Sequence, residues 1–205
     1  MTAEPTIYVV DDDAGVSKAL AGAGALLGHP VRSFASAADF LADYDPAAPG
    51  CLVLDVKMPG MSGLELQRKL ADEGVRIPVV MVSGHADVRI AVEAMTLGAL
   101  TLLEKPFRLD ELIAHLRTAL ARDAAARAAA SRQGAATARL AALTPKEREV
   151  LERIARGATN KDIAAELGLS VRAVEDRRAR LMKKMDARSV ADLVWVLSAT
   201  TESGA

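Results

Sequence analysis

The sequence predicts an α/β fold built on a parallel five-stranded sheet, followed by a small all-α domain of four helices. Over residues 1–122, five short apolar runs alternate with amphipathic helical patterns. Nearly continuous apolar strands separated by helices are typical of a parallel sheet with both faces covered. After residue 139 the hydrophobic residues recur only at helical spacing, which indicates a separate helical domain.

Each strand is expected where a short apolar run with β-type composition is bounded by polar or turn residues. The predicted strands span residues 6–10, 30–34, 51–54, 77–82 and 100–103. The predicted helices that follow them span residues 15–27, 36–44, 64–73, 86–96 and 108–122. Crossovers between parallel strands are right-handed, and ligands of such sheets bind outside the carboxyl ends of the strands.

Residues 123–139 are expected to connect the two domains. The stretch consists mostly of alanine and has almost no large side chain to bury. Alanine is the best helix former, so the first half should prolong the preceding helix as far as Gly134. Such compositions form both stiff helices and frayed tethers, and the sequence leaves both open.

The helices of the second domain are marked by their end signals and span residues 145–156, 160–167, 171–184 and 189–198. Thr144, Pro145 and Glu147 form a capping box with proline at the first helical position. Gly168 and Ser170 make a short turn that ends one helix and caps the next. Two short helices joined by such a turn are a helix-turn-helix signature.

Composition excludes several classes of protein. With 205 residues, 51% of them hydrophobic, and a net charge of −1, the chain is neither disordered throughout nor a strongly basic coat protein. No apolar stretch is long enough to cross a bilayer and Met1 begins no secretory signal, so we expect a cytoplasmic protein without a membrane partner. Residues 1–122 carry a net charge of −5 and residues 139–205 a net charge of +3, which predicts different surfaces.

Polar side chains gather at the carboxyl ends of the predicted strands. Asp11 and Asp12 directly follow the first strand, and Asp55 ends the third. In a sheet of strand order 2-1-3-4-5 these ends are neighbours, and their like charges repel unless a cation intervenes. A divalent hard cation, Mg²⁺ above all, suits oxygen ligands of this kind. Ser83 ends the fourth strand and Lys105 the fifth, which completes a set suited to phosphoryl transfer.

The segments at these strand ends resemble the receiver domain of two-component response regulators, whose fold is flavodoxin-like. The matching segments are VVDDD (9–13), LDVKMPGMSG (54–63), VSGH (82–85) and EKPF (104–107). By that resemblance, the phosphoryl group is accepted by Asp55, hydrogen-bonded by Ser83 and paired with Lys105. The implied ligands of Mg²⁺ are Asp11, Asp12, Asp55 and the backbone carbonyl of Lys57.

Neighbouring positions need separate interpretation. By the resemblance, the Lys105–Pro106 peptide bond is expected to be cis. Asp13 is one residue closer to the first helix than the proposed metal ligands, so it is expected to cap that helix. Leu102 stands where the family usually carries a Tyr or Phe that turns inward on activation. Either the output route runs through other contacts of helix four, strand five and helix five, or the coupling is weaker.

The second domain resembles the LuxR-type helix-turn-helix module over residues 140–200. The matching segments are LTPKEREVL (143–151), ARG (155–157), TNKDIA (159–164) and LGLS (167–170). The whole chain therefore resembles NarL/FixJ-type response regulators, and the FixJ side is closer. The recognition helix departs from the family at Ala173 and Arg177, where Thr and His are usual.

Contacts with double-stranded promoter DNA are expected from this recognition helix. The candidates for phosphate contacts, which position the module without reading sequence, are Thr159, Lys161, Arg172, Arg177 and Lys184. By carry-over from the family, the base-facing positions are Glu175, Asp176 and Ala179. Carboxylates accept hydrogen bonds from cytosine N4, whereas Ala can touch only a thymine methyl. Glu175 and Asp176 are also expected to pair with arginines of the same helix and to offset part of the attraction to phosphate.

These resemblances imply a response regulator that is switched by phosphorylation. A sensor histidine kinase would phosphorylate Asp55, and the phosphorylated form would form a homodimer that binds promoter DNA. The only catalysis expected is the domain's own phosphotransfer and dephosphorylation, so the protein is not expected to be an enzyme. Two alternatives stay open. One is a DNA-binding regulator that needs no phosphorylation and uses its first domain as a dimer platform, and the other is a Mg²⁺-dependent phosphohydrolase.

Overall fold

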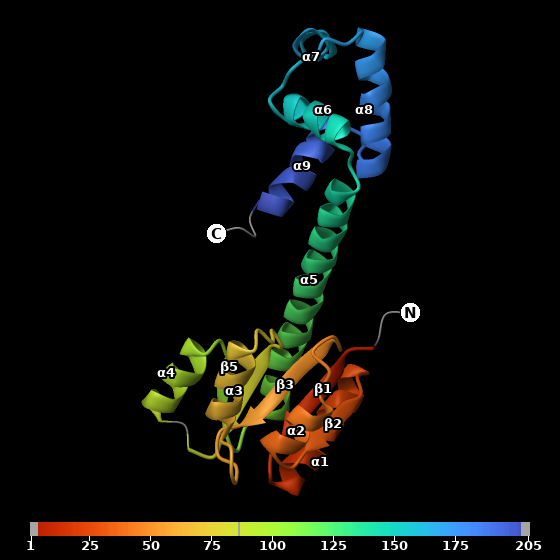
Figure 1. Cartoon of the computed structure of the whole chain (residues 1–205). Helices are drawn as coiled ribbons and strands as arrows, with labels where there is room; N and C mark the ends of the chain where they lie inside the picture. The colour runs from red at the N-terminus through yellow and green to blue at the C-terminus, as the bar shows by residue number, and fades with distance from the viewer. Residues whose placement is uncertain (1–3, 86, 202–205) are drawn as a thin grey trace. The chain divides into compact units, whose positions relative to one another are not determined.

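The computed structural model describes residues 4–85 and 87–201, which belong to two compact units, Met1–Arg127 and Ala128–Ala205 (Figure 1). The strands of the first unit are β1 (Thr6–Val10), β2 (Val31–Phe34), β3 (Gly50–Asp55), β4 (Val79–Ser83) and β5 (Thr101–Glu104). Its helices are α1 (Ala14–Leu27), α2 (Ala37–Asp43), α3 (Gly63–Asp72) and α4 (Val88–Thr96), and α5 (Leu109–Ala141) begins in it.

The five strands form one parallel sheet in the order β2-β1-β3-β4-β5, which confirms the predicted topology. In its register, Val10 pairs with Leu54 and Asp55 pairs with Val82. Ser83, the last residue of β4, pairs with Glu104 at the end of β5. The polar residues that end the strands therefore lie at one edge of the sheet.

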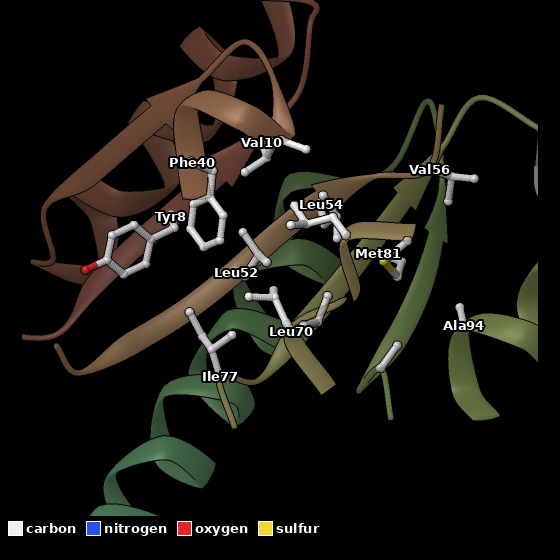
Figure 2. Packing of buried hydrophobic residues seen from close by; sticks show 14 of the residues in the cluster. Tyr8, Val10, Phe40, Leu52, Leu54, Val56, Leu70, Ile77, Met81 and Ala94 are labelled. Carbon is white, nitrogen blue, oxygen red and sulfur yellow. The ribbon is translucent and has the colours of Figure 1, made fainter. Parts of the chain in front are cut away.

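Helices cover both faces of the sheet, as predicted. Alternate side chains of a strand point to opposite faces. On one face, Leu52 and Leu54 of β3 belong to a core with Phe40 of α2 and Leu70 of α3 (Figure 2). On the other face, the core combines residues of β1, β3, β4 and β5 with α1 and α5, among them Leu116.

Helix α5 runs through the predicted connection to Ala141 and does not end at Gly134. One glycine inside a helix costs only about 1 kcal/mol relative to alanine, and the surrounding residues are mostly alanine. The first unit extends to Arg127, beyond the predicted end of the sheet domain at residue 122. The alanine-rich composition gave no sign that this part of the helix makes specific contacts.

Those contacts come from Asp123 and Arg127, which fasten α5 to the loop before β3. Asp123 is 4% exposed and accepts a hydrogen bond from the Gly50 backbone N–H at 3.0 Å. The Arg127 guanidinium binds the Asp123 carboxylate at 2.9 Å. It also donates to the carbonyls of Ala47 at 2.7 Å and Ala48 at 2.5 Å. Helix and loop are thus joined by one charged hydrogen-bond network, the Asp123–Arg127 clamp.

The further helices of the second unit are α6 (Pro145–Ala155), α7 (Asn160–Leu167), α8 (Val171–Met185) and α9 (Val190–Thr201). Thr144 and Glu147 form the predicted capping box of α6, and Gly168 ends α7 in the left-handed conformation with φ of 63°. Ser170 caps α8 as predicted. The helices pack around buried Val150, Ile163, Val174, Leu181 and Met185. Among the described residues, no helix is long and apolar enough to cross a membrane.

Candidate functional site

Asp11, Asp55 and Lys105 meet at the carboxyl edge of the sheet. Lys105 Nζ donates to Asp11 Oδ2 at 2.6 Å and to Asp55 Oδ1 at 2.7 Å. Asp11 is only 2% exposed and Asp55 5% exposed, so both carboxylates are largely shielded from water. The structure thus brings together three residues that lie far apart in the sequence. We call these three residues the carboxylate–lysine cluster.

The cluster changes the protonation equilibria of its members. Burial raises the pKa of Asp55 above its ordinary value, and the hydrogen bond from Lys105 only partly opposes this. The nearby Asp11 carboxylate raises that pKa further. Burial works to lower the pKa of Lys105, but its hydrogen bonds with Asp11 and Asp55 outweigh burial and raise it. With both carboxylates ionised, one ammonium leaves the cluster with one uncompensated negative charge.

The backbone after β3 holds Asp55 in place. The Lys57 backbone N–H donates to Asp55 Oδ2 at 2.7 Å, and the Gly63 N–H donates to the Val56 carbonyl at 3.0 Å. A Cβ atom at Gly63 would lie 2.0 Å from the Asp55 carbonyl oxygen. The start of α3 can therefore pack against the backbone of Asp55 only because residue 63 has no side chain. Gly63 directly precedes the helix predicted over residues 64–73, but its close approach to Asp55 depends on the tertiary structure.

Asp12 and Asp13 differ in role from Asp11. Asp12 is exposed, and no hydrogen bond joins it to the carboxylate–lysine cluster among the described residues. Asp13 caps α1 as predicted, since its side chain accepts a hydrogen bond from the Gly15 N–H at 2.7 Å. The Asp13 backbone N–H in turn donates to Asp11 Oδ1 at 2.9 Å and orients that carboxylate.

Ser83 lies beside the cluster with its hydroxyl engaged by the following loop. The hydroxyl donates to the His85 carbonyl at 2.8 Å and accepts from the His85 N–H at 3.2 Å. The Lys105 backbone N–H donates to the Ser83 carbonyl at 2.8 Å, which joins the ends of β4 and β5. The Lys105–Pro106 bond is cis, as expected.

The donor set of the cluster fits Mg²⁺. Its two buried carboxylates supply oxygen ligands, which Mg²⁺ prefers over nitrogen or sulfur ligands. They also supply an excess of negative charge, which attracts a cation. Among the described residues, no three His, Cys, Asp or Glu side chains already form a group that could hold a metal. Mg²⁺ commonly binds one or two protein carboxylates and keeps several waters, so Asp11 and Asp55 meet its minimal requirement. Asp12 and the Lys57 carbonyl remain predicted ligands.

In the second unit, α7 and α8 form the predicted helix-turn-helix. Arg178 of α8 donates to Asn160 Oδ1 of α7 at 2.9 Å and ties the two helices together. Local sequence patterns do not indicate this pair, because the two residues lie on different helices 18 positions apart. Buried Val174, Leu181 and Met185 fix which face of α8 packs on the unit and which remains outside.

The predicted DNA-contacting residues divide into free and engaged groups. Five of the predicted contact residues make no side-chain hydrogen bond or ion pair within the described part of the chain: Lys161, Arg172, Glu175, Asp176 and Arg177. Of these, Arg177 is half-buried and the others are exposed, as is Ala179. The expected ion pairs of Glu175 and Asp176 with arginines of α8 are therefore absent from the described part of the chain. Both carboxylates are left facing solvent.

Thr159 and Lys184 are engaged within the unit. The Thr159 hydroxyl donates to Asp162 at 2.6 Å in the capping box of α7. Lys184 Nζ donates to Glu147 Oε2 at 2.7 Å and to the Ala142 carbonyl at 3.3 Å. The hydrogen bonds from Lys184 and then from the Thr144 N–H lower the pKa of Glu147 to about 2. A phosphate contact by Lys184 would have to compete with this ion pair.

Comparison with known families decides the identity of the chain. Residues 7–117 match the response regulator receiver domain, and residues 141–197 match the luxR family of bacterial regulatory proteins. The chain belongs to the two-component response regulators. The luxR-family match assigns the helix-turn-helix of this response regulator to a DNA-binding domain, so the protein is a DNA-binding transcription regulator.

Relatives and solved structures agree over nearly the whole response regulator. It is 42% identical to the response regulator protein TmoT of Ectopseudomonas mendocina, over 98% of this chain and 91% of the relative. It is 42% identical to the transcriptional regulatory protein FixJ of Bradyrhizobium diazoefficiens, over 95% of each chain. The structure of the response regulator StyR matches with a TM-score of 0.88 and 39% identity, over 96% of this chain and 99% of StyR.

Proposed function

We propose that a sensor histidine kinase phosphorylates Asp55 and that this modification controls promoter binding. The observation that carries the proposal is the placement of the buried Asp55 carboxylate 2.7 Å from Lys105 Nζ. A carboxylate oxygen of Asp55 attacks phosphorus, the bond between phosphorus and the kinase histidine breaks, and an acyl phosphate forms. Asp11 and Asp55 would hold Mg²⁺, which would supply positive charge to offset that of the phosphoryl oxygens. Lys105 pairs with the same oxygens, and attack by water later releases phosphate and restores Asp55.

Ser83 couples the phosphorylation of Asp55 to the rest of the first unit. Its hydroxyl donates to the His85 carbonyl. The new phosphoryl oxygens are stronger acceptors than a peptide carbonyl, because they are charged. Ser83 turns to donate to them and releases the loop that leads into α4. Phosphorylation then acts by stabilising this second arrangement over the first.

Helix α4 provides the surface on which we propose that the phosphorylated form dimerises. Val88, Val92 and Met95 are 81%, 60% and 50% exposed, and their spacing places them on one side of the helix. Leu102 of β5 packs on the core of the same face of the sheet. A second copy of the chain covers such an apolar surface and brings two DNA-binding domains to adjacent half-sites.

We propose residues 1–122 as the phosphoacceptor domain, residues 123–139 as the connection, whose start packs on that domain as far as Arg127, and residues 140–205 as the DNA-binding domain. In this proposal Lys161, Arg172 and Arg177 contact phosphates, and Thr159 and Lys184 join them once their internal hydrogen bonds exchange. Glu175, Asp176 and Ala179 face the bases.

We also propose that the protein works in the cytoplasm, because it must bind both a sensor kinase and chromosomal DNA.

The test is the intact mass of the protein after incubation with acetyl phosphate, with and without Mg²⁺, for the wild type and Asp55→Asn. We expect one phosphoryl adduct that requires both Mg²⁺ and Asp55. If no adduct forms on the folded protein, Asp55 is not an acceptor for small phosphodonors. If Asp55→Asn leaves dimerisation and promoter binding unchanged, the phosphorylation-independent regulator is favoured. Multiple turnover of the protein on a phosphate ester would instead favour the phosphohydrolase.

A further inference from the structure

The first unit contains a cavity at the opposite edge of the sheet from the carboxylate–lysine cluster. Its volume is about 520 Å³, and it is lined by α3, the loop between α3 and β4, the start of β4, the loop between α4 and β5, and α5. Because β4 and β5 are parallel to β3, their starts lie far from the strand ends that carry Asp55 and Lys105. We call it the amino-edge cavity.

The walls of the amino-edge cavity are mostly apolar. They include Leu70 of α3, Ile77 just before β4, and Leu97 and Leu100 of the loop before β5. Sites for small molecules commonly enclose about 300–1,000 Å³ and combine apolar walls with a few polar groups. The size and the walls of this cavity fall within that description.

Gln67 supplies a buried polar group on the cavity lining. It is 3% exposed, and its Nε2 donates to the Ala94 carbonyl at the end of α4 at 3.1 Å. Its Oε1 atom is buried and has no hydrogen-bond partner among the residues that the structure describes. Buried acceptors of this kind are nearly always paired in folded proteins, because leaving them unpaired is costly. This unpaired acceptor lies beneath the surface of the cavity lining.

Arg76 and Arg122 give the cavity a positive charge. Both line it and both are exposed. Neither makes a hydrogen bond or ion pair with any residue in the described part of the chain. No Asp or Glu lines the cavity to balance them. An anionic group bound here would meet two guanidinium groups that are not already paired.

We propose that the amino-edge cavity binds a small amphipathic organic anion. Its anionic group pairs with Arg76 and Arg122, and its apolar body covers the leucine and isoleucine side chains. Inorganic phosphate would leave the apolar walls in contact with water. A neutral apolar molecule would leave both guanidinium groups without a partner.

Two fluorescent probes that differ in one group test this proposal on the full chain. 8-Anilino-1-naphthalenesulfonate has an apolar body, an N–H donor and a sulfonate, whereas N-phenyl-1-naphthylamine lacks the sulfonate. We expect one equivalent of the sulfonate probe to bind, with Arg76→Gln and Arg122→Gln each weakening it by about threefold, as for a lost exposed ion pair. The neutral probe should bind these variants and the wild type equally. Ala126→Trp, which fills the cavity from α5, should weaken both probes.

Matched variants separate this site from other surfaces. Arg117→Gln removes the same charge from the same helix at an exposed position that does not line the cavity, and it should leave both affinities unchanged. Val92→Ser alters the exposed face of α4 and should also leave them unchanged. The proposal is wrong if Val92→Ser abolishes binding while Ala126→Trp does not. It is equally wrong if Arg117→Gln weakens the sulfonate probe as much as Arg76→Gln and Arg122→Gln do.

Discussion

Replacing Arg127 by methionine tests whether the Asp123–Arg127 clamp stabilises the first unit. Methionine keeps an apolar stem of similar length but removes every donor of the guanidinium. The change leaves the Asp123 carboxylate buried, with the Gly50 N–H as its remaining partner in the network. The carbonyls of Ala47 and Ala48 lose a charged donor at the same time.

The size of the effect follows from the exposure of the pair. Removing one partner of a fully buried ion pair typically costs about 3–5 kcal/mol. The Arg127 side chain is 33% exposed and that of Asp123 only 5%, so solvent screens part of the interaction. We therefore expect Arg127→Met to lower the free energy of unfolding of the first unit by about 2 kcal/mol. This corresponds to a roughly 30-fold larger equilibrium constant for opening of the unit, the opening constant.

Cys51 makes this opening measurable within the first unit. It is the one cysteine of the chain, its exposed fraction is 0%, and it follows Gly50 directly on β3. Burial raises the pKa of its thiol to about 12, so the folded state does not react with a thiol reagent at neutral pH. When closing is faster than labelling, the labelling rate is proportional to the opening constant. Arg127→Met should thus be labelled about 30-fold faster than the wild type.

Two further variants test whether the effect comes from the Asp123–Arg127 clamp. Arg117→Met removes an arginine from an exposed position on the same helix and should leave the rate unchanged. Asp123→Asn keeps an acceptor for the Gly50 N–H, and combining it with Arg127→Met should cost less than the sum of the two changes. A labelling rate of Arg127→Met within about twofold of the wild type, far below the expected factor, would refute the reasoning.

Three further predictions concern the carboxylate–lysine cluster and the Glu147–Lys184 ion pair of the DNA-binding domain. Gly63→Ala should destabilise the first unit by about 3 kcal/mol or more in urea unfolding, because the new Cβ would lie 2.0 Å from the Asp55 carbonyl oxygen. Lys105→Met should raise the pKa of Asp55 in a carbon-13 NMR titration, because hydrogen bonding by Lys105 opposes the effect of burial. The pKa of Glu147 is about 2 in the folded state against an ordinary 4.5, so its ion pair with Lys184 stabilises fully above pH 4.5 and the benefit is lost as the pH falls toward 2. Glu147→Gln should remove this dependence of the urea midpoint on pH.

Each of these predictions has a matched control. A Cβ at Gly134 meets no atom within 4 Å, so Gly134→Ala should stabilise helix α5 by about 0.5–1 kcal/mol. The Lys57 side chain is exposed, and Lys57→Met should leave the Asp55 titration unchanged. Glu166→Gln removes an exposed partner of Arg153 and should preserve the acid dependence. Wild-type stability of Gly63→Ala, an unshifted Asp55 in Lys105→Met, or an unchanged acid dependence in Glu147→Gln would each contradict its prediction.

Periodicity and end signals were enough to predict most of the secondary structure. The apolar runs and capping residues marked the strands, the parallel sheet and the helix-turn-helix, because these depend on local sequence. The sequence left open whether the alanine-rich connection is a stiff helix, and α5 continues past Gly134 to Ala141 because the surrounding alanines outweigh the cost of one glycine. The aspartates, serine and lysine at the strand ends were predictable for a related reason, since parallel strands finish at the same edge of a sheet.

Residue types, their order along the chain and the motifs at the strand ends determined the fold class, the family resemblance and the proposed phosphoacceptor. The tertiary structure decided which polar groups are already paired. Lys184 binds Glu147, Arg178 binds Asn160, and Arg127 binds Asp123. It also decided that Gln67 and two arginines share one cavity. Such pairings depend on distances between elements that are remote in sequence, and local propensity and periodicity carry no information about those distances.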